Sequence, residues 1–160
     1  MSGTLVPDGG RAAAAERKLT PEEIRRRIRA AGWAVLAVLE GARPYAVPMA
    51  YGYDGRRFFV ASGPGRKRRA LEREPLVCLT ILDGPDDLGS GSYVVVLGRA
   101  TPVSSWFDRL RAGLFILRRF SRGGIPSLIE LRRMAHGRVF RIDPHEVAGR
   151  ARAVLTAHAL

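Results

Sequence analysis

Short apolar runs follow one another rapidly along this chain, and the turn residues between them restrict the possible folds more than any other feature of the sequence. The runs are rich in valine, leucine and aromatic residues, which is typical of strands. Asp54-Gly55 is a tight-hairpin signal. Gly98 is expected to mark a bulge or a bend, and Pro144 to end the last strand. The predicted strands cover 33–39, 45–53, 57–61, 77–83, 92–103 and 138–142.

Helical signals are confined to the start of this strand series, to one short connection and to one insertion. Thr20-Pro21-Glu22-Glu23 predicts a capping box, in which the side chains of Thr20 and Glu23 satisfy free amides at a helix start. Gly32 is expected to end that helix. Further helices are predicted at 66–73, 106–120 and about 127–135, and a loop at 84–91. This order predicts a mainly β chain with flanking helices (α+β), built on a small antiparallel barrel.

A chain of 160 residues provides one domain with one core. The domain is expected over 19–150, with a helical insertion at about 105–136. Residues 1–18 are expected to form a flexible tail without the apolar centre of a secretory signal, and 151–160 a C-terminal tail. The single cysteine, Cys78, allows no internal disulfide, so a cytoplasmic location is expected. No apolar stretch approaches the roughly 20 residues that span a bilayer.

Basic residues strongly outnumber acidic ones. The 27 lysines and arginines against 15 acidic residues give a formal net charge of +12. This excess favours an anionic partner, which is a phosphorylated cofactor, a nucleic acid or an acidic membrane surface. The charge alone does not distinguish among these three partners. A GC-rich genome would also produce the same excess of arginine without any binding role.

The side chains offer little chemistry of their own. His136, His145 and His158 are scattered without ligand spacing, and with one cysteine they predict no zinc site. The sequence has no GxSxG, HExxH or Walker motif. An enzymatic activity would therefore depend on a bound cofactor.

The segment Ser-Gly-Pro-Gly-Arg-Lys at 62–67 joins a predicted strand to a predicted helix. Its glycines let the backbone approach an anion, and the amides at the helix start face such a group. Arg66 would add a planar fork for phosphate oxygens and Lys67 a compact charge. The alternative is an ordinary solvated turn.

Several segments, taken in order, resemble the pyridoxamine 5'-phosphate oxidase-like flavoproteins, including the subgroup linked to nitroimidazole reduction. The resemblance covers roughly residues 20–105 and 138–150. The matching pieces are PYAVPMAYGYDG (44–55), FFVAS (58–62), GRK (65–67), ALEREPLVCL (70–79), SYVVVLGRA (92–100) and VFRIDPHEVAGR (139–150).

The resemblance implies a six-stranded antiparallel split β-barrel of the type that binds flavin mononucleotide (FMN), in a homodimer with two cofactor sites at the interface. Backbone groups of one strand would run along the isoalloxazine ring, and basic side chains would hold the phosphate. The implied site residues are Val47, Pro48, Met49, Ala50 and Tyr51 along the ring; Val60, Ala61 and Ser62 beside the ring or the ribityl chain; Arg66 and Lys67 at the phosphate; and Ser92, from the same or the second subunit.

Two positions depart from the family pattern. Position 60 is valine where the nitroimidazole-linked proteins often carry histidine, which argues against that activity. Position 61 is alanine, which lacks a hydroxyl that some relatives place near the phosphate. The arginine-rich insertion 106–133 matches no pattern of the family; it could cover the active site, contact a membrane or a nucleic acid peripherally, or be solvated.

The leading hypothesis is an FMN-dependent oxidoreductase that acts on a small organic substrate. The sequence does not identify a catalytic acid or base for it. A reductase of the same fold that uses a deazaflavin coenzyme is the alternative, because the acidic tail of that coenzyme suits the positive charge. A non-enzymatic barrel that binds nucleic acid is a second alternative. Against it, the predicted strands show no basic stripe interleaved with exposed aromatic residues.

Overall fold

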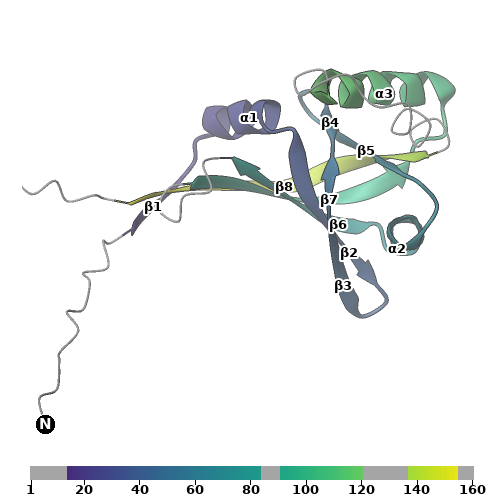
Figure 1. Cartoon of the computed structure of the whole chain (residues 1–160), viewed down its shortest axis with the longest axis horizontal. Helices are drawn as coiled ribbons and strands as arrows, with labels where there is room; N and C mark the ends of the chain where they lie inside the picture. Colours follow the sequence, from purple (N-terminus) through teal and green to yellow (C-terminus); the bar gives the residue numbers. More distant parts are fainter. Residues whose placement is uncertain (1–13, 84–90, 121–136, 155–160) are drawn as a thin grey trace, which may run out of the picture.

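The computed structural model describes residues 14–83, 91–120 and 137–154. In this part of the chain, eight strands form one antiparallel sheet, and three helices pack around it (Figure 1). The mainly β class and the split-barrel architecture are therefore confirmed. The strands are β1 (Ala14–Lys18), β2 (Trp33–Glu40), β3 (Arg43–Ala50), β4 (Gly52–Tyr53), β5 (Phe58–Ser62), β6 (Leu76–Asp83), β7 (Gly91–Pro102) and β8 (Arg138–Val154). The described sheet has eight strands and not the expected six, because the sequence does not predict β1 and one predicted strand forms both β3 and β4.

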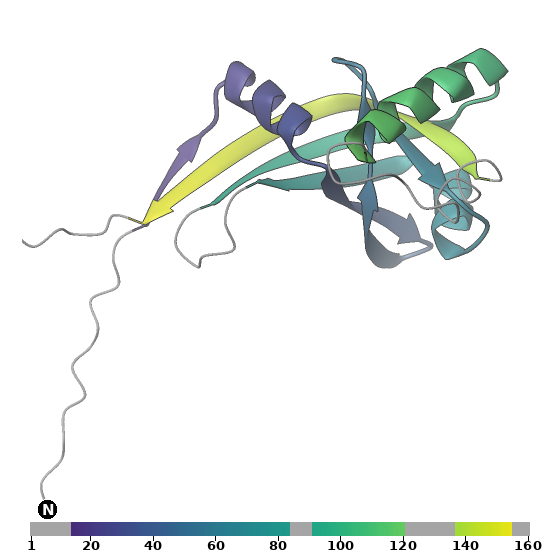
Figure 2. The same cartoon turned by 45° about the horizontal axis from the view of Figure 1, so that its top comes forward.

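The two ends of the sheet are joined through a single residue. The strand order is β3-β2-β6-β7-β8-β5-β4, and β3 and β4, at opposite ends of this order, are separated only by Tyr51. The Tyr51 side chain is fully buried, and its hydroxyl donates to the carbonyl oxygens of Ile28 and Ala31 at 2.6 and 3.1 Å. The predicted single strand 45–53 is therefore wrong. The chain changes its pairing partner at Tyr51, from β2 to β5, and this change curls the sheet into a split barrel (Figure 2).

The last strand is much longer than the sequence predicts. Strand β8 extends to Val154, so the prediction that Pro144 ends it is wrong. The β7–β8 register shifts between Leu97 and Gly98, which leaves an irregularity in the ladder where Pro144 lies opposite Gly98. Proline is tolerated at such a bulge because the ladder is already interrupted there. The predicted bulge at Gly98 is confirmed; a Cβ on this glycine would lie 2.8 Å from the Asp143 carbonyl oxygen.

Both predicted tails contribute to the sheet. Strand β1 pairs with the end of β8, from Ala14↔Val154 to Lys18↔Arg150. The predicted tail 1–18 is therefore wrong for residues 14–18, and the predicted tail 151–160 is wrong for residues 151–154. Neither segment has the pattern of an independent strand, and each is ordered by the hydrogen bonds that its partner provides.

Three helices are described. Helix α1 (Pro21–Ala30) begins with the predicted capping box: the Glu23 amide donates to the Thr20 hydroxyl at 3.3 Å, and the Thr20 amide donates to the Glu23 carboxylate at 2.9 Å. Helices α2 (Arg66–Arg73) and α3 (Trp106–Phe120) have their predicted bounds. The predicted helix at about 127–135 and the predicted loop at 84–91, except for Gly91, lie outside the described residues.

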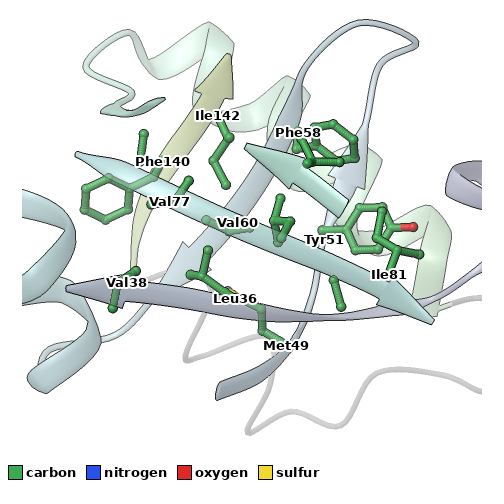
Figure 3. Packing of buried hydrophobic residues seen from close by; sticks show 14 of the residues in the cluster. Leu36, Val38, Met49, Tyr51, Phe58, Val60, Val77, Ile81, Phe140 and Ile142 are labelled. Atoms are coloured by element: carbon green, nitrogen blue, oxygen red, sulfur yellow. The ribbon is translucent and has the colours of Figure 1, made fainter. Parts of the chain in front are cut away.

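The main core fills the barrel with side chains from β2, β3, β5, β6, β7 and β8 (Figure 3). A second, smaller cluster lies between α3 and the barrel and contains Phe59, Ala112, Ile116 and Val139. Gly52 makes this contact possible, because a Cβ there would lie 2.8 Å from the Phe115 Cβ and 3.0 Å from the Ile116 amide nitrogen. In the described segments, none of the helices combines the length and the apolar character needed to cross a bilayer.

Candidate functional site

A cavity of about 660 Å³ lies where β3, the end of β5 and the start of α2 meet. This volume is in the range of sites that hold a cofactor or a small organic ligand. Helix α3 contributes one side chain to the cavity, and β2 contributes another. The lining residues are Trp33, Tyr45, Pro48, Met49, Ala50, Ala61, Ser62, Gly63, Pro64, Gly65, Arg66, Lys67 and Ile116.

One end of the cavity is polar and basic, and we call it the basic end (residues 62–67). Gly65 has a φ of 142°, a conformation that favours glycine, and it precedes α2 without a side-chain cap. The amides of the first helical turn are therefore available to an anion. Ser62 is buried, and its hydroxyl donates to the Gly63 carbonyl oxygen at 3.2 Å.

Two residues of the β2–β3 hairpin contact the Arg66 side chain. Its guanidinium forms an ion pair with the Glu40 carboxylate at the end of β2. The guanidinium carbon also lies 4.5 Å from the centre of the Tyr45 ring on β3, in a cation–π contact. These two contacts orient Arg66, and an anion bound at the basic end would have to share it with Glu40.

Lys67 differs from Arg66 because, in the part of the chain that is described, no carboxylate forms an ion pair with it. Burial lowers the pKa of Lys67 below its usual value of 10.5. A bound anion would compensate the charge that burial disfavours. Lys67 is therefore the cation of the cavity that would gain most from a phosphate group.

The other end of the cavity is apolar, and we call it the apolar end (Trp33, Pro48, Met49, Ala50 and Ile116). Trp33 lies opposite Ala50 in the β2–β3 ladder, and its side chain is 58% exposed. Met49 is almost fully buried, and Ile116 projects from α3. Apolar walls of this kind suit a planar ring system.

The structure brings together seven of the eleven predicted site residues in this cavity. Those seven are Pro48, Met49, Ala50, Ala61, Ser62, Arg66 and Lys67. The other four lie elsewhere in the described chain. Val60 and Tyr51 are fully buried in the core, and half-buried Val47 lies opposite Leu36 in the sheet. Ser92 lies at the start of β7, where its hydroxyl accepts a hydrogen bond from the Arg27 side chain.

Sequence reasoning missed three lining residues, Trp33, Tyr45 and Ile116. Tyr45 and Trp33 belong to predicted strands, where an aromatic residue is expected without any binding role. Ile116 belongs to the apolar pattern of a predicted helix, and only the contact of α3 with β4 brings it to the cavity. Among the described residues, no cluster of histidine, cysteine or acidic side chains could hold a metal ion.

The fold is shared with solved structures of low sequence identity. A protein named as a candidate 5-nitroimidazole antibiotic resistance protein, from Bacteroides thetaiotaomicron, is 21% identical with a TM-score of 0.69, over 87% of this chain and 89% of that one. A FAD-binding protein from Mesorhizobium loti is 22% identical with a TM-score of 0.70, over 88% and 98%. A FAD-binding protein from Mycobacterium smegmatis is 17% identical with a TM-score of 0.59, over 84% and 95%.

No curated protein matches the chain. The family model described as pyridoxamine 5'-phosphate oxidase matches residues 20–151, which include every strand of the barrel except β1 and the last residues of β8. The match therefore covers the whole cavity and both of its ends. The chain belongs to the pyridoxamine 5'-phosphate oxidase family.

Proposed function

We propose that this protein binds FMN in the cavity and acts as an FMN-dependent oxidoreductase on a small organic substrate. The observation that supports this proposal is the division of one cavity into a basic end, where Arg66 pairs with Glu40 at the β2–β3 hairpin, and an apolar end, where Trp33 lies at the other end of that ladder. A phosphorylated flavin has the same division, with a planar ring at one end and a phosphate at the other. The names of two similar structures, both FAD-binding proteins, agree with a flavin ligand.

The residues that line the cavity fit a phosphorylated flavin. Lys67 and the first-turn amides of α2 would bind the phosphate, and Arg66 would be shared between the phosphate and Glu40. Met49, Ala50 and Ile116 would exclude water from one side of the ring. When bound, the flavin supplies the electron transfer, and the protein positions the ring.

We also propose a homodimer that forms through the outer face of the sheet. Leu39, Leu76 and Leu82 are exposed and alternate with buried core residues along β2 and β6, so they lie on the face opposite the core. Trp33 is exposed on the same face of β2 and also lines the cavity. A second copy on this face would cover exposed apolar surface and bring its own residues close to the cavity.

The deazaflavin-dependent reductase remains a second candidate. The net charge of +12 favours it, because this coenzyme carries an acidic tail beyond its phosphate. Both candidates use the same cavity and differ in the ring and in the tail.

The test is an absorbance spectrum of the purified protein, before and after FMN is added and the sample is desalted. We expect retention at about one FMN per chain, since a site that encloses the ring and pairs the phosphate releases it slowly. The same experiment with FAD and with the deazaflavin coenzyme distinguishes the candidates. Failure to retain any of the three would contradict the proposed function, and a monomer in light scattering would contradict the proposed dimer.

A further inference from the structure

Helix α3 exposes large apolar side chains on the face that points away from the barrel. Trp106, Phe107, Leu110 and Leu114 are 63%, 68%, 54% and 52% exposed. Phe107, Leu110 and Leu114 follow the i, i+3, i+7 spacing, and Trp106 extends the same stripe at the start of the helix. The rings of Trp106 and Phe107 lie 4.3 Å apart. We call these four residues the outer stripe of α3.

The opposite face of α3 fixes this orientation. Ala112 and Ile116 are buried against the barrel, and the Phe115 ring stacks on Phe59 with 6.0 Å between the ring centres. The close approach of Gly52 to Phe115 and Ile116 leaves little room between α3 and β4 for the larger side chains of the outer stripe. Figures 1 and 2 show α3 on the outside of the molecule, apart from α1. Large apolar side chains that gather on one exposed face are typical of a surface that binds a partner or a membrane.

The charges beside the stripe indicate which environment. Helix α3 contains four arginines and one acidic residue, Asp108. Arg111 and Arg118 are exposed and, at about 100° per residue, border one side of the stripe. Arg109 lies on the other side, where it donates to the Gly137 carbonyl oxygen at 3.0 Å. An apolar stripe with tryptophan, phenylalanine and leucine that is bordered by arginine is the pattern of helices that lie in a membrane interface.

We propose that the outer stripe of α3 docks the protein on an anionic lipid surface, with the helix parallel to the membrane. The apolar side chains would enter the boundary between head groups and acyl chains, and the arginines would contact acidic head groups. Charge favours this occupant over a second copy of the chain. Two copies that met through α3 would bring the exposed Arg111 and Arg118 side chains of both copies close together, and like charges repel.

The test measures binding of the whole 160-residue chain to vesicles by co-sedimentation. Vesicles of phosphatidylcholine alone are compared with vesicles that also contain phosphatidylglycerol. We expect binding only to the anionic vesicles, and weaker binding as the salt concentration rises. In a Trp33→Phe background, the remaining tryptophan, Trp106, should shift its fluorescence to shorter wavelength on binding, because the ring leaves water.

Two variants separate the apolar contribution from the charged one. The triple substitution Phe107→Ser, Leu110→Ser and Leu114→Ser should reduce vesicle binding at least about tenfold, since apolar burial contributes most of the anchoring. Arg111→Gln with Arg118→Gln should reduce binding by about fivefold for each arginine. Val147→Ser is the matched control, because Val147 is an exposed apolar residue outside α3, and it should leave binding unchanged.

Three results would overturn the proposal. The first is absence of binding to anionic vesicles at low salt. The second is equal binding of the wild-type protein and both α3 variants. The third is conversion of a dimer to a monomer by the triple substitution with a native circular dichroism spectrum, which would assign the stripe to a second copy. Because FMN retention is measured separately, this proposal and the proposed function can fail independently.

Discussion

At the basic end of the cavity the lining residues are consecutive in the sequence, from 62 to 67, whereas at the apolar end they come from three separate elements. The basic end needs only a glycine-rich loop and the start of α2. The apolar end needs β2, β3 and α3 to be in place together. Its geometry therefore depends on the barrel closure at Tyr51 and on the contact of α3 with Gly52.

The two ends of the cavity therefore depend on the fold in different ways. A change at the basic end should alter the recognition of a phosphate and leave the ring site intact. A change in the support of the apolar end should weaken every flavin, with or without a phosphate. Comparison of FMN with riboflavin, which lacks the phosphate, distinguishes these two outcomes for any variant.

The largest effect is expected from Lys67→Met. The substitution removes the half-buried cation that we assign to the phosphate, and a hydrogen bond to a charged group contributes about 1.5–3 kcal/mol. FMN affinity should therefore fall by about one to two orders of magnitude, while riboflavin affinity stays unchanged, as measured by fluorescence titration. Lys18→Met is the matched control, because Lys18 is exposed on β1. An equal loss for both ligands would show that Lys67 supports the cavity and does not bind the phosphate.

Gly52→Ala should affect the apolar end. The new Cβ would lie 2.8 Å from the Phe115 Cβ, so α3 must move, and overpacking of this kind lowers the free energy of unfolding by about 1–3 kcal/mol. FMN and riboflavin should lose affinity by the same factor, because Ile116 moves with α3. Thermal unfolding and the same titrations measure both effects. Gly32→Ala, at a position outside the cavity lining with no atom near the new Cβ, is the control. Unchanged stability of Gly52→Ala would contradict the described contact.

A smaller effect is expected from Glu40→Gln. The ion pair with Arg66 is partly exposed, and such pairs contribute about 0.2–1 kcal/mol. The loss of the carboxylate frees Arg66 for the phosphate, so FMN affinity should increase by up to about fivefold without a change for riboflavin. Arg66→Gln should reduce FMN affinity less than Lys67→Met does. A decrease in FMN affinity for Glu40→Gln would show that Glu40 orients Arg66 more than it competes with the phosphate.

The smallest effect concerns pH. Burial lowers the pKa of Lys67 in the folded protein, so the folded state releases this proton at a lower pH than the unfolded state does. The free energy of unfolding of the wild-type protein, relative to Lys67→Met, should therefore rise as the pH passes through the lowered pKa and level off above 10.5. The preference for FMN over riboflavin should decline over the same pH range, because Lys67 loses the charge that binds the phosphate. Denaturant unfolding of both proteins at several pH values measures the difference, and a difference that does not vary with pH would contradict it.

The sequence predicts the elements whose signals are local. The capping box at Thr20 fixes the start of α1, and the glycine loop before Arg66 indicates both α2 and the basic end. The apolar periodicity of 106–120 gives α3 its correct bounds. In each of these segments, neighbouring residues in the chain are enough to determine the local structure.

The sequence does not predict features that depend on distant partners. The change of pairing at Tyr51 depends on hydrogen bonds to carbonyl groups at the end of α1. Strand β8 passes Pro144 because β7 provides a register shift opposite it. Trp33 and Ile116, more than 80 positions apart in the chain, line the same cavity only after the barrel closes and α3 packs on Gly52.

The most direct test of the central claim is the affinity of the wild-type protein for FMN and for riboflavin, measured side by side in one buffer. If the basic end binds the phosphate and the apolar end binds the ring, riboflavin binds and FMN binds at least about tenfold more tightly. Equal affinities would contradict the assignment of the phosphate to Arg66 and Lys67. Absence of binding by either flavin would contradict the proposed use of the cavity.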